Sequence, residues 1–123
     1  MDERRNLRRR HLRYYLHVHD RVTGDFFGRL ADITIGGLML ITEEPVEVGS
    51  RYEFRIDFRN ELEGKRHILL TADCKWCDRD TINPAYHASG YELESLSEQD
   101  MLVIKALIVE YGLRMYREED QEE

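Results

Sequence analysis

Alternation of hydrophobic and polar residues runs through much of the chain. Its clearest case is RYEFRIDF, in which Tyr52, Phe54, Ile56 and Phe58 occupy every second position. Successive side chains of a β-strand point to opposite faces, so these four side chains share one face and the charged residues between them share the other. The segment is predicted to be a strand with one face in a hydrophobic core.

Five more segments are predicted to be strands, because they are rich in β-branched and aromatic residues and are bounded by turn signals. They cover residues 12–22, 26–35, 38–42, 65–77 and 86–96. The predicted turns contain TGD, the Gly-Gly pair, EEPVEVGS, NELEGK and DRDTINPA. No helical pattern separates the six strands, which indicates an antiparallel β-barrel or β-sandwich.

A helix is predicted from Ser97 to Arg117. Asp100 follows Ser97 by three positions, a variant of the capping box that begins many helices. Apolar residues surround this helix almost completely: Met101, Leu102, Val103, Ile104, Ala106, Leu107, Ile108, Val109, Tyr111 and Leu113. A helix lying on a small barrel buries one face only. The additional apolar residues therefore indicate either a helix inserted in the open end of the barrel or a homodimer interface. The pattern leaves both interpretations open.

The composition is that of a soluble globular protein with one domain. The chain has 123 residues, of which 41% are hydrophobic and 35% are charged. No apolar run reaches the ~20 residues of a membrane-spanning helix, and no signal-peptide apolar region follows the arginine-rich start. We therefore expect a cytoplasmic protein without a membrane partner.

Charge is distributed unevenly along the chain. The segment before the first predicted strand holds six arginines: Arg4, Arg5, Arg8, Arg9, Arg10 and Arg13. We predict a mobile basic arm at residues 1–13, a β-barrel at 14–96, the helix at 97–117 and an acidic tail at 118–123. The net charge of -7 argues against nucleic acid as the partner, because proteins that coat nucleic acid carry a broad basic face.

Cys74 and Cys77 are the only cysteines and form a CxxC pattern, which is typical of redox and zinc sites. Here the pattern falls in a predicted strand, where three residues separate Cα atoms by ~10 Å, too far for a disulfide. A zinc site would need a second such pair. Both cysteines are therefore predicted to be reduced and structural.

The stretch DITIGG combines a carboxylate and a hydroxyl. In a strand, Ile33 and Ile35 are expected to point into the core, while Asp32 and Thr34 share the opposite, polar face. Asp and Thr beside a Gly-Gly turn are common as local hydrogen-bonding residues, so the stretch by itself does not establish a binding site.

The arginine-rich arm favours the interpretation that this stretch is part of a binding site. Arg9 and Arg13 are four positions apart, and a planar guanidinium can bind a phosphate or a guanine edge through two hydrogen bonds. A carboxylate such as that of Asp32 suits the N–H donors of guanine. Gly36 and Gly37 lack Cβ atoms and permit close approach of another group. The combination fits a ligand with both phosphate and guanine.

These residues resemble the motifs of the PilZ domain, the bacterial receptor for cyclic di-GMP. RRRHLR contains RxxxR as Arg9 to Arg13, and DITIGG matches D/NxSxxG as Asp32 to Gly37. The resemblance implies a mainly β fold: a six-stranded antiparallel (split) β-barrel with a mobile basic N-terminal arm and a C-terminal helix. It implies a binding protein rather than an enzyme, with no cofactor or metal besides the ligand.

The resemblance also assigns roles to the motif residues. Arg9 and Arg13 would bind phosphates and guanines as the arm closes over the ligand. Asp32 and Thr34 would contact a guanine from the barrel surface, and Gly37 would leave room for it. The family's usual serine is Thr34 here, which keeps the hydroxyl, so binding is expected to persist, with an effect of the added methyl on affinity.

Four further residues complete the predicted ligand site. Arg8 precedes the motif at a position associated in the family with a stacked pair of ligand molecules, and Arg10 would be an accessory cation. Gly36 lies within the second motif. Trp76 occupies a strand position where some members have a tryptophan beside the ligand, and its ring could stack on a base. The alternative for Trp76 is packing in the barrel.

The predicted function is that of a cyclic di-GMP receptor and adaptor. Ligand binding would order the arm and change the surface offered to an unidentified effector protein. A further hypothesis places the acidic tail near the arginines until ligand displaces it. One alternative is a protein-binding adaptor of the same fold that does not bind the nucleotide, and another is an electrostatic hook for nucleic acid or acidic membranes. An enzyme is the weakest alternative, since His17 and His19 share a strand face without a third metal ligand nearby in sequence.

Overall fold

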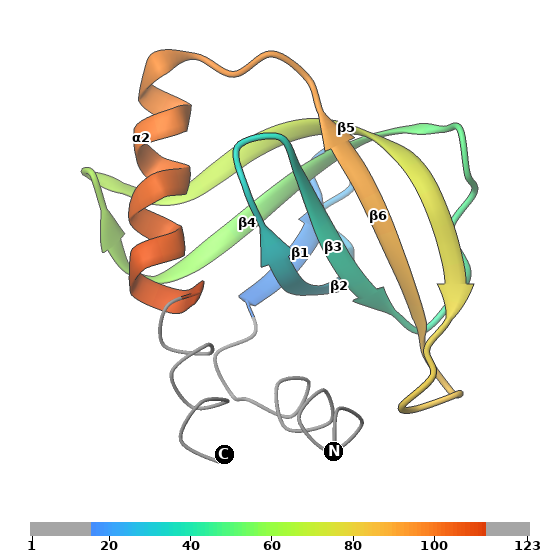
Figure 1. Cartoon of the computed structure of the whole chain (residues 1–123). Coiled ribbons are helices and arrows are strands. Elements are labelled where there is room, and N and C mark those ends of the chain that lie inside the picture. The colour runs from blue at the N-terminus through green and yellow to red at the C-terminus, as the bar shows by residue number, and fades with distance from the viewer. Residues whose placement is uncertain (1–15, 113–123) are drawn as a thin grey trace.

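Six antiparallel strands form a closed barrel in the computed structural model, which describes residues 16–112 (Figure 1). The elements are β1 (Leu16–Asp20), β2 (Phe26–Ile33), β3 (Gly37–Thr42), β4 (Arg51–Leu62), β5 (Lys65–Arg79), β6 (His87–Leu93), the helix α2 (Glu98–Leu107) and the π-helical turn η1 (Ile108–Gly112). The predicted arm at 1–13 and acidic tail at 118–123 lie outside the described residues.

The strand order around the barrel is β1-β2-β3-β6-β5-β4, and β1 pairs with both β2 and β4. Closure leaves no strand of the described chain at a free sheet edge, because each of the six strands pairs with a neighbour on both sides. The predicted six-stranded antiparallel barrel is confirmed.

The alternation in β4 produces the expected buried face. Phe54, Ile56 and Phe58 are buried, and they pack with apolar residues from the other five strands. The strand continues beyond Phe58 to the buried Leu62, so the predicted turn at 60–65 was too long. Only the residues between β4 and β5 form the turn, and both have positive φ: Glu63 at 50° and Gly64 at 77°.

The prediction that Ile35 points into the core is wrong. β2 ends at Ile33, and the Thr34 amide donates to the Gly37 carbonyl at 2.8 Å, which closes a tight turn between β2 and β3. Ile33 is buried, whereas Ile35 sits on the turn and is 47% exposed. The alternation was extended two residues too far because a turn interrupts the strand periodicity.

Two other predicted strands are shorter than expected. β1 ends at Asp20, whose Oδ1 accepts hydrogen bonds from the amides of Val22 and Thr23, so the chain turns there. The segment 12–15 of that prediction lies outside the described residues. β6 ends at Leu93, and residues 94–97 connect it to the helix without regular secondary structure.

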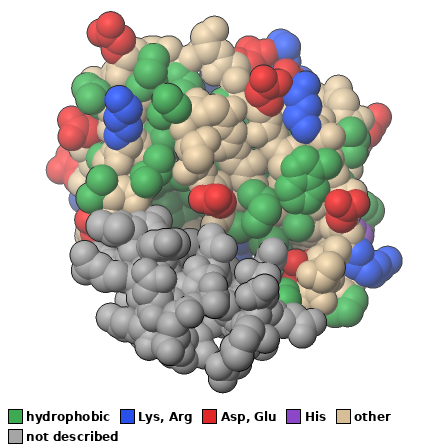
Figure 2. All heavy atoms as spheres, in the orientation of Figure 1, with side chains coloured by type: hydrophobic (Ala, Val, Ile, Leu, Met, Phe, Trp, Pro, Cys, Tyr) green, Lys and Arg blue, Asp and Glu red, His purple; other side chains and the backbone are tan. Residues whose placement is uncertain are grey.

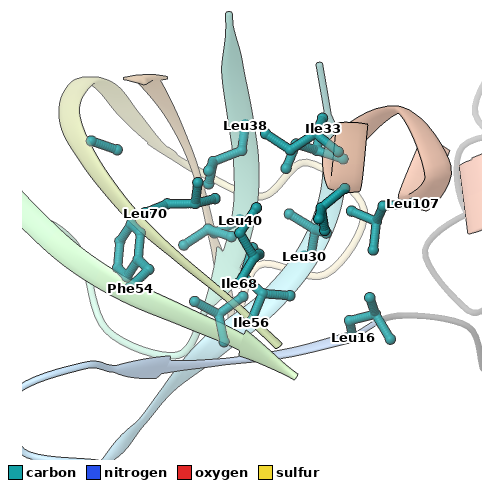
Figure 3. Packing of buried hydrophobic residues seen from close by; sticks show 14 of the residues in the cluster. Leu16, Leu30, Ile33, Leu38, Leu40, Phe54, Ile56, Ile68, Leu70 and Leu107 are labelled. Atoms are coloured by element: carbon teal, nitrogen blue, oxygen red, sulfur yellow. The ribbon is translucent and has the colours of Figure 1, made fainter. Parts of the chain in front are cut away.

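α2 closes one end of the barrel (Figure 1). Val103, Ile104 and Leu107 are almost completely buried in the same cluster as the strand residues. Figure 3 shows Leu107 and Leu16 at the helix end of this core and Phe54 at the other end. The structure therefore shows the first of the two interpretations of the apolar helix.

The end of the helix is anchored by Tyr111. Its hydroxyl accepts a hydrogen bond from the Arg59 amide at 3.1 Å, and its ring is buried. Leu102 and Val109 remain 51% and 65% exposed on the outer side of the helix, so the homodimer interface stays a prediction. The helix ends earlier than expected as a regular α-helix, because a π-helical turn follows Leu107. The predicted residues 113–117 lie outside the described chain.

The N-cap of α2 allows a test of local stability. The Ser97 hydroxyl accepts a hydrogen bond from the Asp100 amide at 3.0 Å, as the sequence predicted. Replacing Ser97 by alanine is expected to lower the free energy of unfolding by about 1 kcal/mol, because one helix-terminal amide loses its acceptor. Urea unfolding would measure the loss. Ser95→Ala, at an exposed position outside the cap, is the control, and an equal loss in both variants would contradict the assignment.

Both cysteines are free, as predicted. Cys74 is buried, and this burial raises the pKa of its thiol. The Cys77 sulfur is half-buried and accepts a hydrogen bond from the Val46 amide at 3.3 Å. The burial of Cys74 and the hydrogen bond to Cys77 agree with the predicted structural role of both side chains. Separately, among residues 16–112 no helix is long and apolar enough to cross a membrane.

Candidate ligand-binding site

One cross-strand row on the outer surface of the barrel joins two of the predicted site residues, Asp32 and Trp76. Asp32 of β2 pairs with Met39 of β3, Met39 pairs with Gly90 of β6, and Gly90 pairs with Trp76 of β5. Three strand spacings separate the ends of the row, or ~14 Å. Asp32 and Trp76, which are far apart in sequence, therefore face the same patch of surface.

An open pocket of about 250 Å³ lies over this row. Its lining residues come from four strands and one turn: Asp32, Ile33, Thr34, Gly37, Leu38, Met39, Trp76, Gly90 and Tyr91. Of the nine residues predicted for the ligand site, the structure brings four to this pocket: Asp32, Thr34, Gly37 and Trp76. Gly36 lies in the adjoining turn and does not line it.

Asp32 supplies the negative charge of this pocket, which contains no other acidic residue among its lining. One carboxylate oxygen, Oδ1, accepts a hydrogen bond from the Ile33 amide at 2.9 Å, which fixes the side chain against the strand. The side chain is exposed. Its second oxygen has no hydrogen bond with the rest of the described chain and is available to a donor from a ligand.

Thr34 is not on the strand face where it was expected. Its hydroxyl oxygen accepts hydrogen bonds from the amides of Gly36 and Gly37, each at 3.2 Å, and it lies 3.5 Å from the Gly37 carbonyl oxygen. The hydroxyl thus organises the turn that follows β2, in the manner of local Ser/Thr turns. The Thr34 hydroxyl therefore contributes to the shape of the pocket wall through hydrogen bonds within the turn.

Gly37 is required by the packing of two strands. A Cβ atom there would lie 2.4 Å from the carbonyl oxygen of Tyr91 in β6, closer than atoms can approach. The absence of a side chain therefore permits β3 and β6 to pair at this point. A Cβ at Gly36 would meet only the Thr34 hydroxyl, at 3.9 Å. That Gly37 also leaves room for a guanine stays a prediction.

Trp76 lies on the outside of the barrel rather than in its core. Its side chain is 41% exposed, and its indole lies across the backbone of Gly90, where a Cβ atom would be 2.0 Å from the ring nitrogen. Gly90 therefore lets the ring lie close to the strand surface. The exposed ring could stack on a planar ligand in the pocket.

Adding one methyl group at Gly90 should displace this ring. Gly90→Ala is expected to shift the fluorescence of Trp76, the single tryptophan of the chain, while lowering the free energy of unfolding by only about 1 kcal/mol, because an exposed side chain can move aside. Emission spectra and urea unfolding would measure both effects. In a Trp76→Ala background the same methyl group should leave the free energy of unfolding almost unchanged. A similar cost in both backgrounds would contradict the contact.

Five residues of the pocket were not predicted as site residues from the sequence: Ile33, Leu38, Met39, Gly90 and Tyr91. Met39 was read as one more apolar strand residue, although the alternation around Leu38 and Leu40 places it on the outer face. Gly90 and Tyr91 lie in a strand that carried no motif. The Tyr91 hydroxyl is buried 2.8 Å from the Ser89 hydroxyl, and burial raises the pKa of Tyr91 far above its usual value. Tyr91 is therefore a neutral part of the wall.

No lysine or arginine is among the residues that line the pocket. In Figure 2, which views the outer face of β3 and β6, the Lys and Arg side chains lie toward the edges of the described surface. Two cations of β4 and β5 are already paired: Lys75 lies 3.3 Å from Glu92, and Arg51 contacts Asp73 and Glu94. An anionic ligand in this pocket would need cations from another part of the chain.

The predicted cations are Arg8, Arg9, Arg10 and Arg13, which lie outside the described residues. The chain enters the described structure at Leu16, which pairs with Leu30, two residues before Asp32. Arg13 is three residues from Leu16, so its Cα cannot be more than ~11 Å from that of Leu16, and the limit for Arg9 is ~25 Å. Chain connectivity therefore keeps both arginines within reach of the Asp32 end of the pocket.

Two solved structures have a fold similar to that of this chain. Inhibitor of motility (MotI/DgrA) of Bacillus subtilis superposes with a TM-score of 0.58 at 14% identity, covering 80% of this chain and 47% of that one. The PlzA protein of Borreliella burgdorferi, determined in complex with c-di-GMP, gives a TM-score of 0.52 at 14% identity, covering 90% of this chain and 49% of that one. The chain thus spans about half the length of either protein.

Comparison by sequence gives a separate result. No curated protein matches the chain. The family model of the PilZ domain, however, matches residues 2–110, which include both motifs, the whole barrel and the helix α2. The chain therefore belongs to the PilZ domain family.

Proposed function

We propose that the protein is a receptor for cyclic di-GMP that acts on another protein through a change in its surface. The observation that carries the proposal is the row from Asp32 to Trp76, which joins a carboxylate and an exposed indole across one pocket of a PilZ barrel. The role is one of binding rather than catalysis.

The two ends of the pocket suit the two chemical features of a guanine base. The carboxylate of Asp32 can accept hydrogen bonds from the two adjacent N–H groups of a guanine edge. The indole of Trp76 offers a flat apolar surface on which a purine can stack. Met39 lies between them and provides a polarizable floor that adapts to the ring.

The phosphates of the ligand need positive charge that the described pocket lacks. Arg9 and Arg13 are the proposed source, because connectivity keeps them within reach of Asp32 and because a guanidinium binds phosphate through two charge-assisted hydrogen bonds. Arg8 and Arg10 would add to the positive charge around the ligand. Gathering four arginines near one another is unfavourable without an anion, so ligand and arm stabilise each other.

Ordering of the arm supplies a mechanism for signalling. Fixing the backbone of each arm residue costs about 1–2 kcal/mol, which contacts with the phosphates and bases must exceed. The arm therefore changes state only when ligand is present, and the surface around the pocket changes with it. An effector protein that binds one of the two surfaces would read the ligand concentration.

The described similarities support a nucleotide ligand. PlzA, whose barrel superposes on this one, was determined with c-di-GMP bound, and MotI/DgrA is an inhibitor of motility. A nucleotide-independent adaptor is the second candidate function. The observation that favours it is the engagement of the Thr34 hydroxyl within its own turn, which leaves it fewer sites for a ligand.

Calorimetric titration of the full chain with cyclic di-GMP tests the proposal. We expect saturable binding that is lost in Arg13→Ala, because removal of one guanidinium leaves a phosphate without its partner. Absence of a heat of binding when cyclic di-GMP is titrated into the wild-type chain would contradict the receptor function and favour the adaptor. Binding of random-sequence DNA with a steep salt dependence would instead indicate an electrostatic hook.

A further inference from the structure

A second pocket lies at the opposite end of β2 from Asp32. It has a volume of about 270 Å³ and combines apolar and acidic residues, chiefly Phe26, Phe27, Val46, Tyr52, Glu43 and Glu44. We call it the aromatic pocket. We propose that it docks a basic segment of a partner protein that inserts one bulky apolar side chain between acidic residues. This inference does not depend on the nucleotide.

The aromatic pocket is separate from the candidate ligand site. Phe26 begins β2 and Asp32 lies six residues further along the same strand, a separation of ~20 Å. The two pockets share no lining residue. A partner at Phe26 and a ligand at Asp32 could therefore be bound at the same time.

The apolar part of the aromatic pocket is held in place by its neighbours. The ring of Phe27 packs against Tyr52 at 5.5 Å between centroids and against Phe54 at 4.9 Å. Tyr52 and Phe54 are parallel, with an interplanar angle of 1°. Because these rings are fixed from inside the barrel, an inserted side chain would not need to create its own cavity.

The loop between β3 and β4 forms the other wall, and hydrogen bonds hold it at several points. The Thr42 hydroxyl donates to the Glu44 carbonyl at 2.7 Å, and the Glu47 amide donates to the Tyr52 hydroxyl at 3.2 Å. The Val46 amide donates to the Cys77 sulfur. A wall attached to β4 and β5 in this way keeps the pocket open without an occupant.

The exposed surface around the aromatic pocket is negatively charged. Glu43, Glu44 and Glu47 are all exposed, and none forms an ion pair with another residue in 16–112. Phe26 is 47% exposed beside them. An apolar surface next to unpaired carboxylates attracts a segment in which arginine or lysine flanks a bulky apolar residue, and it repels acidic segments.

The arm of the chain is also basic and is the competing occupant of the aromatic pocket. The arm joins the barrel at Leu16, opposite Leu30, whereas Phe26 pairs with His19 near the other end of β1. Leu16 and His19 are three residues apart, or ~10 Å, so attachment at Leu16 does not by itself keep the arm from the pocket. The proposal is committed to a partner segment on the basis of charge complementarity, and occupation by the arm is an outcome that the test distinguishes.

A peptide probe tests the docking surface on the full chain. The probe is a fluorescein-labelled peptide with leucine and phenylalanine flanked on both sides by two arginines, and its binding is measured by fluorescence anisotropy. We expect saturable binding, at least tenfold weaker for a peptide with serine and glycine in place of leucine and phenylalanine. Glu43→Lys/Glu44→Lys should weaken binding of the original probe at least tenfold, because the flanking arginines lose their partners.

The matched control is Glu61→Lys/Glu98→Lys, which makes the same change in net charge at exposed positions near the helix end of the barrel. It should leave affinity within about twofold, since charges beyond a Debye length are screened. Equal losses in the two double variants, equal binding of both peptides, or no binding would overturn the proposal. Binding that appears only after Arg4, Arg5, Arg8, Arg9 and Arg10 are replaced by serine would assign the aromatic pocket to the arm instead.

Discussion

Asp32→Ala is expected to weaken binding of cyclic di-GMP about 100-fold without destabilising the barrel. A guanine edge would donate two hydrogen bonds to this carboxylate, and bonds to a charged group contribute about 1.5–3 kcal/mol each. At the low end of that range the two bonds together contribute about 3 kcal/mol, which is slightly more than two powers of ten in affinity. The side chain is exposed, and within the described residues it is hydrogen-bonded to the neighbouring Ile33 amide, so the free energy of unfolding should change by less than about 0.5 kcal/mol.

Asp25→Ala is the matched control for this prediction. Asp25 is an exposed aspartate just before β2, at the other end of that strand from the pocket, and its removal changes the net charge equally. Titration calorimetry on both variants separates a local contact from a general effect of charge. Equal affinity in the Asp32→Ala and wild-type chains would remove Asp32 from the site, even if the wild-type chain binds the ligand.

Gly37→Ala is expected to lower the free energy of unfolding by about 3 kcal/mol, at the upper end of the cost of overpacking. The added Cβ would lie 2.4 Å from the Tyr91 carbonyl oxygen, and both groups belong to paired strand backbones that cannot move separately. This contrasts with Gly90, where the obstructing group is a side chain that can swing outward. Urea unfolding followed by tryptophan fluorescence would measure the difference.

The neighbouring glycine provides the control. Gly36→Ala adds the same methyl group one residue earlier, where the nearest atom is 3.9 Å away, so its effect should stay within about 0.5 kcal/mol. If Gly37→Ala is as stable as wild type but loses ligand affinity, the glycine serves the ligand rather than the pairing of β3 and β6. The two variants together distinguish a motif residue that shapes the fold from one that contacts a nucleotide.

Several features of the fold were predictable because they depend on local periodicity. The buried face of β4 follows from alternation at Phe54, Ile56 and Phe58, and the start of α2 follows from the hydroxyl of Ser97. The length of β2 was not predictable in this way. Ile35 continues the alternation, yet a turn closed by Thr34 and Gly37 removes it from the strand. Periodicity describes which face a strand residue occupies, but not where a turn interrupts the strand.

The candidate site was predictable only in its motif residues. Asp32 and Trp76 carry chemistry that is recognisable in a linear sequence, a carboxylate beside a Gly-Gly turn and a strand tryptophan. Met39 and Gly90 carry none, and they enter the site because the strand register places them between the other two. The aromatic pocket was missed for the same reason, since Phe27 and Tyr52 meet only through the pairing of strands.

The amino-acid sequence was sufficient to locate the six strands and the helix cap, because each depends on neighbouring positions and on side-chain chemistry. The tertiary structure alone decided which strands pair and in which register. That register aligns residues from four strands in one row, and it assigns the glycines to strand contacts rather than to flexibility. Pairing between distant segments depends on the packing of the whole barrel, so no local pattern specifies it.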